Sequence, residues 1–550
     1  MKNALIIGSG ISGLTSAIEC ARRGVMVTLV SPFPSERAQS VLAAGGINAV
    51  LAAGDTGDSI ESHIEDTLKG GCYIAGRKSV TGLCENAPDI VAWLEKLGTV
   101  FTRDAEHQVC RRAFGGQSHD RTCYCGASTG KQIVTALCME ARRYEGMGRI
   151  DRRFWLDFYS GLIRDGKCYG AMLYNEATGS LECEYADAVI MAVGGQNALF
   201  GKTTGSTLCD GYAAGKLFLQ GVELKNLEFI QYHPTTMETG QKHMLISEAA
   251  RGEGGRLFYE ENGKRVYFME DRFGERGNLM PRDVVSRCIY ETGKQVYLDV
   301  TFLGEKKIRE RIPEIYDLCM KYRGIDISRE SIPVVPSVHF FMGGIAVNER
   351  HETNVENLYA VGECASIYHG ANRLGGNSLL AAVYSGRCVA EAIGDNLGLT
   401  EKLIESRDIS RHPDFSKDLE TEQEKLVRLR RSSSRFSVTY IRDMLAENMK
   451  KDLGILRNKE GLEKGIQDII YYQSIADQLK YDSSEMIYFV YSLQGILALA
   501  RATLVSALSR EESRGAHLRS DFPETSDSFK AATIISYDNG AYRTSLREEE

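Results

Sequence analysis

The first thirty residues alternate between apolar runs and a glycine-rich turn in an order typical of a βαβ unit. Residues 4–7 are a continuous apolar run that predicts a short buried strand, and residues 14–23 carry apolar positions at helical spacing. A second apolar run over residues 25–30 predicts the next strand of a parallel pair. The turn between the first strand and the helix contains Gly8, Gly10 and Gly13.

This G-x-G-x-x-G turn predicts a dinucleotide site. Glycine lets the backbone approach a pyrophosphate closely, and the following helix presents free N–H groups and the positive end of its dipole. Dinucleotide-binding chains usually end the second strand with an acidic residue for the ribose hydroxyls, whereas this strand ends at Ser31. The difference weakens NAD as the ligand without deciding between cofactors.

The later pattern indicates a nucleotide domain that is interrupted and then resumes. Residues 58–100 have helical patterning, and a strand-rich stretch over about 150–184 leads to the apolar strand of "DAVIMAVGG". From about 226 to 336 the sequence is polar and charged with mixed signals, and "VENLYAVGECAS" then restores the nucleotide-type pattern. Residues 413–518 are strongly helical, and we expect the final "TSLREEE" to be a loose tail.

We therefore predict an α/β fold with a discontinuous Rossmann-like domain, an inserted α+β domain and a helical domain after them. A chain of 550 residues is too long for a single core, which agrees with several domains. The predicted boundaries are 1–228 and 336–400 for the two parts of the nucleotide domain, 229–335 for the insertion, 413–518 for the helical domain and 519–550 for a C-terminal region.

Composition excludes several classes of protein. The chain is 43% hydrophobic and 25% charged, as in ordinary soluble globular proteins, and its net charge of -8 argues against nucleic acid as a partner. The apolar run over 487–500 is interrupted by polar residues and too short to span a bilayer, so we expect a core helix there. No signal segment precedes the first strand, which predicts a cytoplasmic location.

The 14 cysteines are scattered without the spacing of a zinc, haem or iron-sulfur site. This usage is typical of free thiols in a reducing compartment. Cys123 and Cys125 form a C-x-C that could act as a redox pair, although two residues on one face of a strand need not be reactive.

Residues that could carry chemistry concentrate in the insertion and in the segment after it. Each one alone has an ordinary explanation, because a histidine is more often a satisfied core residue and a Glu–Arg pair at i,i+3 is usually an exposed ion pair. Asp210, which opens a helix, fits an N-cap and a ligand of ribose or ribitol hydroxyls equally well. The other candidates are His233, Ser247, Glu248, Arg251, Arg282, His339 and Arg373.

Taken together, these blocks resemble the flavoprotein subunits of fumarate reductases and succinate dehydrogenases, and more distantly the L-aspartate oxidases, over nearly the whole chain. The resemblance implies FAD as the cofactor and a mobile capping domain, formed by the insertion, over the flavin. The matching blocks are "GSGISGLTSA", "AAGGINAV", "FGGQS", "EFIQYHPT", "EAARGEGG", "PRDVVSR", "HFFMGGI", "GEC", "HGANRLGGNSLL" and "ESRGAH".

The resemblance also implies how a four-carbon dicarboxylate would bind. His233 and Ser247 would hold one carboxylate, and His339 and Arg373 would hold the other. The electrostatics are reasonable in their own right, because a dianion buried under a cap needs donors or cations at both ends and arginine binds carboxylate bidentately.

For the reduction of fumarate, the resemblance makes Arg282 the proton donor, with Glu248 and Arg251 as its relay. Reduced flavin would deliver hydride to one alkene carbon and Arg282 a proton to the other. A guanidinium is ordinarily a very weak acid, so this role requires neighbouring positive charge and a dry, closed site. Without them, Arg282 would only orient the substrate.

Gln39 determines the expected mode of FAD binding. Relatives in membrane complexes carry an S-H-T sequence whose histidine bonds covalently to FAD, and alignment without gaps places Gln39 at that histidine. Glutamine has no nucleophilic ring nitrogen, so we expect non-covalent FAD and fumarate reduction as the physiological direction. The FAD contacts implied by the resemblance are Gly8, Gly10, Gly13, Ser31, Ser40, Gly45, Gly46, Asp210, Glu363, Ser378 and Leu379.

Two other functions stay open from the sequence. An L-aspartate oxidase would make iminoaspartate, but those enzymes typically read "EGGHS" and "NSLLE" where this chain has Phe114 and Ala381, so the acid for the substrate ammonium is missing. A non-catalytic flavin electron carrier would not need the full set of substrate and relay residues.

The resemblance further implies electron transport of the anaerobic respiratory type with an iron-sulfur partner subunit. The region containing "ESRGAH" is a reasonable docking face for that partner. The chain itself would then be cytoplasmic, or peripheral to the membrane through partner subunits, with no membrane span of its own.

Overall fold

The computed structural model describes residues 2–51, 57–126, 128–240, 242–397, 412–431, 436–476, 478–480 and 487–549. The predicted fold class is confirmed, because strands from before and after an inserted domain share one parallel sheet. The predicted boundary at residue 400 lies outside the described residues.

The parallel sheet has the strand order β19-β10-β1-β2-β6. Every neighbouring pair in it is parallel, as the βαβ unit requires. Because β19 comes after the insertion, the nucleotide domain is discontinuous in sequence. The elements are β1 (Asn3–Ile7), α1 (Ile11–Arg22), β2 (Met26–Ser31), β6 (Ile150–Phe154), β10 (Ala188–Met191) and β19 (Leu358–Ala360).

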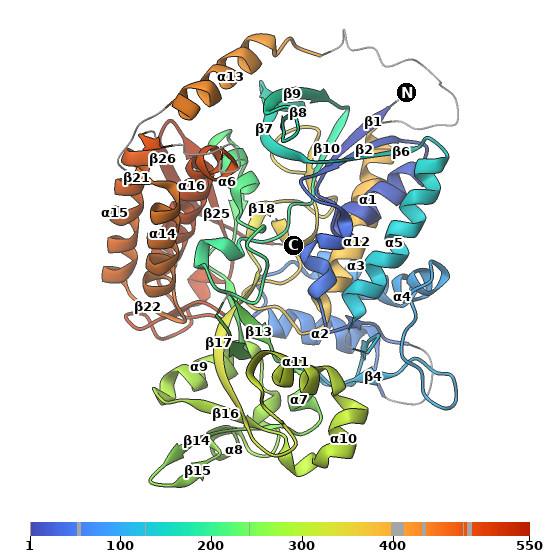
Figure 1. Ribbon diagram of the computed structural model, residues 1–550, viewed down its shortest axis with the longest axis vertical. Helices are drawn as coiled ribbons and strands as arrows, with labels where there is room; N and C mark the ends of the chain where they lie inside the picture. The colour runs from blue at the N-terminus through green and yellow to red at the C-terminus, as the bar shows by residue number, and fades with distance from the viewer. Residues whose placement is uncertain are drawn as a thin grey trace.

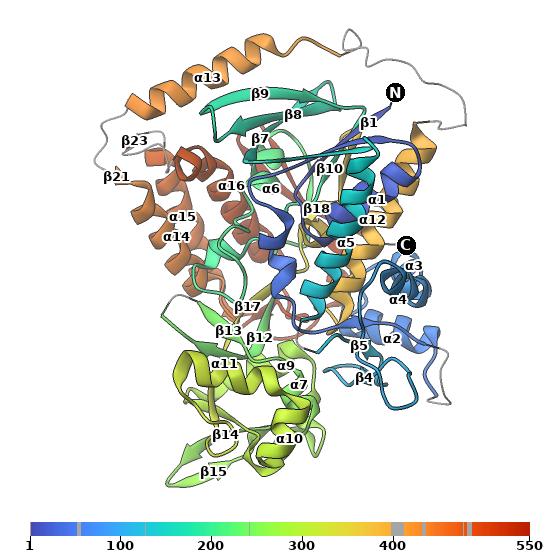
Figure 2. The ribbon, with the colours of Figure 1, turned by 45° about the vertical axis from the view of Figure 1, so that its right-hand side comes forward.

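Helices α1, α5 (Thr129–Gly146) and α12 (Asn377–Asn396) lie side by side along one face of this sheet (Figure 1; Figure 2). Gly386 lets α12 approach α1 closely, because a Cβ atom there would lie 2.8 Å from the Cβ of Thr15. This packing brings the N-terminus of α12 toward the glycine turn at the start of α1.

The remaining N-terminal elements match the predicted patterns. The helical stretch over 58–100 contains α2 (Ile60–Gly70), α3 (Arg77–Glu85) and α4 (Ala87–Lys96). The strand-rich stretch forms an antiparallel sheet of β7 (Leu156–Arg164), β8 (Lys167–Asn175) and β9 (Ser180–Tyr185). Smaller elements are β3 (Ile47–Asn48), β4 (Arg111–Arg112), β5 (Thr122–Cys123) and α6 (Tyr212–Leu219).

The insertion folds around a separate hydrophobic core and occupies the lower end of the molecule in Figure 1. Its six-stranded sheet has the order β13-β12-β17-β16-β14-β15, and the chain enters through β12 (Ile230–Glu238) and leaves through β17 (Ile332–Phe341). The other elements are β13 (His243–Leu245), α7 (Ala249–Gly252), β14 (Arg256–Glu261), β15 (Lys264–Val266), α8 (Phe268–Phe273), α9 (Arg282–Thr292), β16 (Val296–Asp299), α10 (Gly304–Arg311) and α11 (Pro313–Arg323).

The part of the chain after α12 is mainly helical up to residue 509, with α13 (Ser416–Arg431), α14 (Val438–Asp452), α15 (Lys459–Ala476) and α16 (Ile487–Ser509). By length and composition α16 is apolar enough to cross a membrane, but 78% of its most apolar stretch is buried inside the protein. The helix extends beyond the predicted run of 487–500, so the expectation that it is too short to span a bilayer is wrong. Its burial supports the predicted role of a core helix.

The prediction of a loose C-terminal tail is wrong. Strands β25 (Ala532–Asp538) and β26 (Ala541–Arg547) form an antiparallel hairpin that joins β11 (Leu224–Lys225) and β18 (Gly344–Ala346) in one sheet. Glu549 accepts a hydrogen bond of 2.9 Å from Nζ of Lys225, which is almost fully buried. The polar tail is thus ordered by strand pairing and by a buried cation far away in sequence.

The charged side chains of the "ESRGAH" block face inward. Glu512 is fully buried, and its Oε1 accepts a hydrogen bond of 2.8 Å from Nη1 of Arg510, which precedes the block. Nε of Arg510 in turn lies 2.6 Å from Oε1 of Glu228, just before β12. His517 is buried beside them. These residues therefore join the C-terminal region to the nucleotide domain, and a docking face for a partner in this region stays a prediction.

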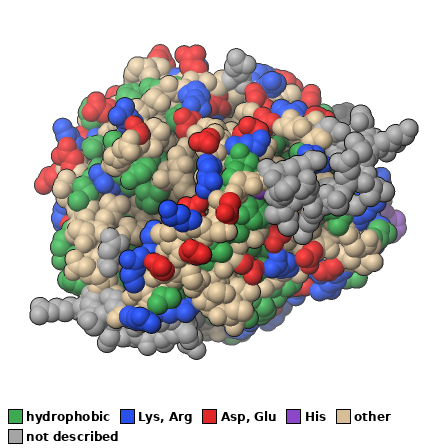
Figure 3. All heavy atoms as spheres, turned by 90° about the horizontal axis from the view of Figure 1, so that it is seen from above, with side chains coloured by type: hydrophobic (Ala, Val, Ile, Leu, Met, Phe, Trp, Pro, Cys, Tyr) green, Lys and Arg blue, Asp and Glu red, His purple; other side chains and the backbone are tan. Residues whose placement is uncertain are grey.

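Surface charge and thiols add little chemistry of their own. On the face seen in Figure 3, acidic and basic side chains are interspersed and no extended basic area is visible.

Burial raises the pKa of both Cys123 and Cys125 to about 12, so neither is a thiolate at neutral pH. A redox role for this pair therefore has no electrostatic support.

Candidate functional site

One cavity of about 500 Å³ connects the glycine turn of the parallel sheet with the inserted domain. All the residues predicted to contact FAD line this cavity except Gly13. A Cβ atom at Gly13 would lie 2.0 Å from the carbonyl oxygen of Gly8, so Gly13 acts through the tight turn itself.

The turn end of the cavity fits a dinucleotide. Gly8 has φ +108°, and a Cβ atom there would lie 2.2 Å from the carbonyl oxygen of Ala192, so only glycine suits this position. Helix α1 begins at Gly10 without a side-chain cap and without an acidic residue in its first turn. The backbone N–H of Ile11 donates to Oγ of Ser40 at 3.3 Å, so the positive dipole end and the N–H groups that follow Ile11 are the features that suit a phosphate group.

Gln39 and Glu363 present further polar groups to the same cavity. Oε1 of Gln39 is buried without a hydrogen-bond partner among the described residues. Burial raises the pKa of Glu363 to about 7, although its carboxylate accepts a hydrogen bond of 3.2 Å from the backbone N–H of Phe341. Such partly satisfied groups fit a ligand with hydroxyl and amide groups, as FAD has.

Asp210 accepts a hydrogen bond at the start of α6, close to the capping role that the sequence suggested, and it also has partners that the sequence did not predict. One carboxylate oxygen accepts a hydrogen bond of 3.0 Å from the backbone N–H of Tyr212 at the start of α6. The other accepts from the hydroxyl of Tyr488 at 2.9 Å and from Nη2 of Arg442 at 3.2 Å. Asp210 therefore joins the wall of the cavity to the helical domain, and an FAD contact at this residue stays a prediction.

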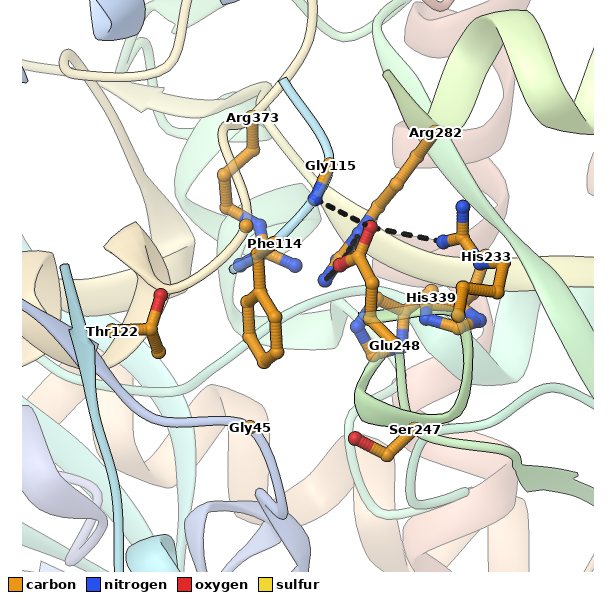
Figure 4. A network of polar contacts seen from close by, with 12 residues as sticks. Gly45, Phe114, Gly115, Thr122, His233, Ser247, Glu248, Arg282, His339 and Arg373 are labelled. Carbon is orange, nitrogen blue, oxygen red and sulfur yellow. Dashed lines mark hydrogen bonds and ion pairs between the residues drawn. The ribbon is translucent and has the colours of Figure 1, made fainter. Parts of the chain in front are cut away.

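Glu248 is the centre of the polar contacts at the inserted-domain end of the cavity (Figure 4). Its Oε2 accepts hydrogen bonds from Arg282 Nε at 3.1 Å and Nη2 at 2.7 Å, and its Oε1 accepts from Arg251 Nη2 at 2.9 Å. The backbone N–H of Gly115 also donates to Oε1 at 3.1 Å. Burial would raise the pKa of Glu248, but the two guanidiniums outweigh it and lower the pKa to about 2.

His233 on β12 and His339 on β17 lie together beside Glu248, with ring centroids 5.1 Å apart (Figure 4). Burial, followed by nearby positive charge, holds the pKa of both imidazoles well below its usual value, so both are neutral. Nδ1 of His339 lies 2.8 Å from the hydroxyl of Thr204, which fixes the orientation of that ring. A neutral imidazole has a single N–H, so each ring can donate to an anion through Nε2 in the tautomer in which Nδ1 accepts, as Nδ1 of His233 can from the backbone N–H of Thr235 at 3.3 Å.

Arg373 is a buried cation without an ion pair among the described residues. Its guanidinium stacks 4.1 Å over the ring of Phe340, and Nη2 donates to the amide oxygen of Gln231 at 3.0 Å. Nε is buried and has no partner in the described part of the chain. Burial and the positive charge of Arg282 lower the pKa of Arg373 well below its usual value. An unpaired buried cation is costly unless an anion binds to it.

The structure thus brings the predicted substrate and relay residues together from both domains. They line the cavity except for Arg251, which lies fully buried behind Glu248. Three arginines and one glutamate leave a net formal charge of +2, which matches a dicarboxylate.

Gln231 and Thr204 contact predicted residues, and Asn372 contacts Gln231, but all three were missed in the sequence. Gln231 and His233 are two positions apart on one strand, so they share a face, and this spacing could have identified Gln231. Thr204 and Asn372 have no comparable local signal. In the described part of the chain, no group of three or more His, Cys, Asp or Glu side chains is arranged to hold a metal ion.

Comparison with protein families gives two matches that together cover most of the chain. Residues 3–379 match the FAD binding domain family, and residues 442–550 match the fumarate reductase flavoprotein C-terminal family.

Individual proteins are similar over nearly their full length. The succinate dehydrogenase flavoprotein subunit of Bacillus subtilis is 35% identical, over 95% of this chain and 92% of that protein. One subunit of the fumarate reductase (CoM/CoB) of Methanothermobacter marburgensis is 34% identical, over 97% and 96%. A variant of E. coli quinol fumarate reductase FrdA has a similar structure, with a TM-score of 0.90, 30% identity and coverage of 100% and 97%.

Proposed function

Because this chain belongs to the family of FAD-dependent fumarate reductase and succinate dehydrogenase flavoprotein subunits, we propose that it reduces fumarate to succinate, a reaction it would also catalyse in reverse. The observation that carries this proposal is the guanidinium of Arg373, which has no ion-pair partner among the described residues. It lines one cavity together with two neutral histidines and the Arg282–Glu248 pair. Its position suits a ligand with a carboxylate at each end.

The binding roles follow from the charges. Arg373 and His339 bind one carboxylate, since the buried Nε of Arg373 lacks any other acceptor among the described residues. His233 and Ser247 bind the other carboxylate through an imidazole N–H and a hydroxyl, which orient it without adding charge. His233, Ser247 and Arg373 are each more than nine-tenths buried, so water is largely excluded around the double bond.

Reduced FAD supplies the hydride when it is bound. Arg282 then gives a proton to the other carbon of the double bond. Arg282 and Arg251 contact different oxygens of Glu248, so a proton can enter the carboxylate from Arg251 and leave toward Arg282. Burial lowers the pKa of Arg251, despite the opposing effect of Glu248, which favours release of its proton into this relay.

Gln39 supports non-covalent FAD and, with it, fumarate reduction as the physiological direction. It lines the cavity and presents a buried amide oxygen there. The ungapped alignment with membrane-bound relatives assigns Gln39 the position of their covalent histidine, and an amide is no nucleophile. Acid precipitation of the purified protein should therefore leave the yellow flavin in the supernatant. Flavin that stays in the protein pellet would contradict this prediction.

Substitution of Arg282 tests the mechanism. Arg282→Lys and Arg282→Ala should lower the rate of dye-linked fumarate reduction by about a hundredfold to ten-thousandfold, because the general acid is lost. The FAD content should stay unchanged. Arg287→Lys is the matched control, since Arg287 lies exposed on the same helix α9 and should retain full activity. Normal turnover by both Arg282 variants would refute the acid role.

L-Aspartate oxidation is not favoured. Phe114 and Ala381 occupy the two diagnostic positions, and both line the cavity with apolar side chains where an acid would meet the substrate ammonium. Turnover of L-aspartate faster than fumarate would overturn the assignment.

The electron donor is an iron-sulfur partner subunit in this proposal, and the chain associates with a membrane only through partners. The support is the likeness to FrdA of the E. coli quinol fumarate reductase. The CoM/CoB relative indicates a thiol donor as the second possibility.

A further inference from the structure

We propose that Gln231 is a positioning residue that holds the guanidinium groups of Arg282 and Arg373 at a fixed spacing through one shared, uncharged acceptor. The inference rests on the proposed function, because it concerns how the substrate-binding arginine and the proton-donating arginine are set relative to each other.

The geometry around Gln231 is specific. Its Oε1 accepts a hydrogen bond of 3.0 Å from Nη1 of Arg282 and another of 3.0 Å from Nη2 of Arg373. Gln231 is fully buried near the start of β12. Arg282 begins helix α9 of the inserted domain, whereas Arg373 lies in the loop before α12 of the nucleotide domain. One amide oxygen therefore joins arginines from two domains.

The neutrality of this acceptor matters. The two guanidiniums repel each other, as the effect of Arg282 on the pKa of Arg373 indicates. A carboxylate between them would relieve the repulsion but would cancel one of the two net positive charges that a dicarboxylate needs. An amide oxygen satisfies one N–H of each arginine and leaves the positive charge available to the substrate.

A chain of hydrogen bonds fixes the orientation of the amide. Nε2 of Gln231 donates to Oδ1 of Asn372 and to the backbone oxygen of Arg373, each at 2.8 Å. Nδ2 of Asn372 donates in turn to Oδ1 of Asp283 at 2.8 Å. An ionised carboxylate can only accept, so Asp283 determines which way Asn372 points, and Asn372 determines which way Gln231 points.

Asp283 is the last residue of this series of hydrogen bonds, and it lines a second cavity of about 310 Å³. Helix α9, the turn at Cys72 and Tyr73, and the segment around Arg514 line that cavity. The orientation of the site amide is therefore anchored where the inserted domain, the nucleotide domain and the C-terminal region meet.

Two substitutions at Gln231 separate charge from geometry. Gln231→Glu keeps the size and both arginine contacts but adds a negative charge. It should keep the melting temperature and the FAD content, while KM for fumarate and Kd for malonate, read from the absorbance of bound FAD, rise about tenfold or more. Gln231→Met removes the shared acceptor and should lower kcat as well as raise KM.

Asp283→Asn tests the remote anchor with almost no change in shape. It should lower kcat several-fold without loss of FAD, because an amide no longer enforces one orientation of Asn372. Asp271→Asn, an exposed position on α8 of the same domain, is the matched control and should leave both constants unchanged.

The outcomes distinguish this inference from the proposed function. Wild-type protein that neither binds malonate nor reduces fumarate would refute the proposed function itself. If the wild type does both, but Gln231→Glu keeps KM and malonate Kd within twofold of the wild type, the positioning role of Gln231 is wrong. Gln231→Glu alone decides this point if Gln231→Met does not fold.

Discussion

Buried charged side chains in this protein are of two kinds: most have an ion-pair partner, and Arg373 has none among the described residues. Glu248 is fully buried and has two arginine partners, and Arg510 is fully buried with Glu228 and Glu512 beside it. Arg373 is as deeply buried but has only an amide as a side-chain partner among the described residues. Buried ions are costly without a partner, so the unpaired one marks the place where a charged ligand is needed.

Glu363 allows a pH test of FAD binding at the level of one residue. Its pKa in the FAD-free protein is raised by burial to about 7, and a carboxylate is needed to accept hydrogen bonds from ribose or ribitol hydroxyls. FAD binding should therefore release a proton, and affinity should increase as pH rises. We expect Kd for FAD to be about tenfold weaker at pH 6 than at pH 8.

Titration of FAD-free protein with FAD at the two pH values measures this difference. Glu363→Gln should remove the pH dependence, because its amide does not titrate. A wild-type Kd that is equal at both values would show that Glu363 does not meet the cofactor as a carboxylate.

At the level of elements, the C-terminal hairpin shows how a polar segment can be ordered by distant partners. Strand β26 is mostly exposed, yet it pairs along its whole length with β25. Beyond it, Glu549 reaches Lys225, whose ammonium is buried at the end of β11. The hairpin thereby covers the sheet just before the chain enters the inserted domain.

Glu549→Gln should destabilise the protein by about 1–3 kcal/mol, because the buried ammonium of Lys225 loses its charged partner. Glu548→Gln is the control, since Glu548 is exposed and should have almost no effect. Thermal unfolding of the two variants under the same conditions checks the difference. Equal melting temperatures would mean that the ion pair contributes nothing measurable.

At the level of the whole molecule, the site belongs to no single domain. The glycine turn and Arg373 come from the nucleotide domain, Glu248 and Arg282 from the insertion, and the helical domain supports the cavity wall through Arg442. Any movement of the insertion relative to the nucleotide domain would separate Arg282 from Arg373. Under the proposed function, substrate binding and proton transfer would therefore depend on the same relative placement of the two domains.

The sequence by itself determined the βαβ unit, the class of fold, the cofactor and the set of candidate residues that the cavity brings together. Where the backbone allows only one residue type, the sequence shows it directly: Gly8 is glycine because no other residue fits beside Ala192. Short sequence blocks of this kind are what match the FAD binding domain family along the chain. The apolar run over 487–500 also identified α16 as a core helix, since burial on nearly all sides requires an apolar run with few charges.

Only the tertiary structure decided which polar groups are paired. The bridge from Gln231 to Arg373 joins residues far apart in sequence, as does the pair of Lys225 and Glu549 that orders the tail. The inward-facing charges of "ESRGAH" and the missing partner of Arg373 within the described residues are likewise properties of pairs and of burial. Burial and pairing depend on which residues the fold brings into contact. The order of residue types along the chain does not specify those contacts.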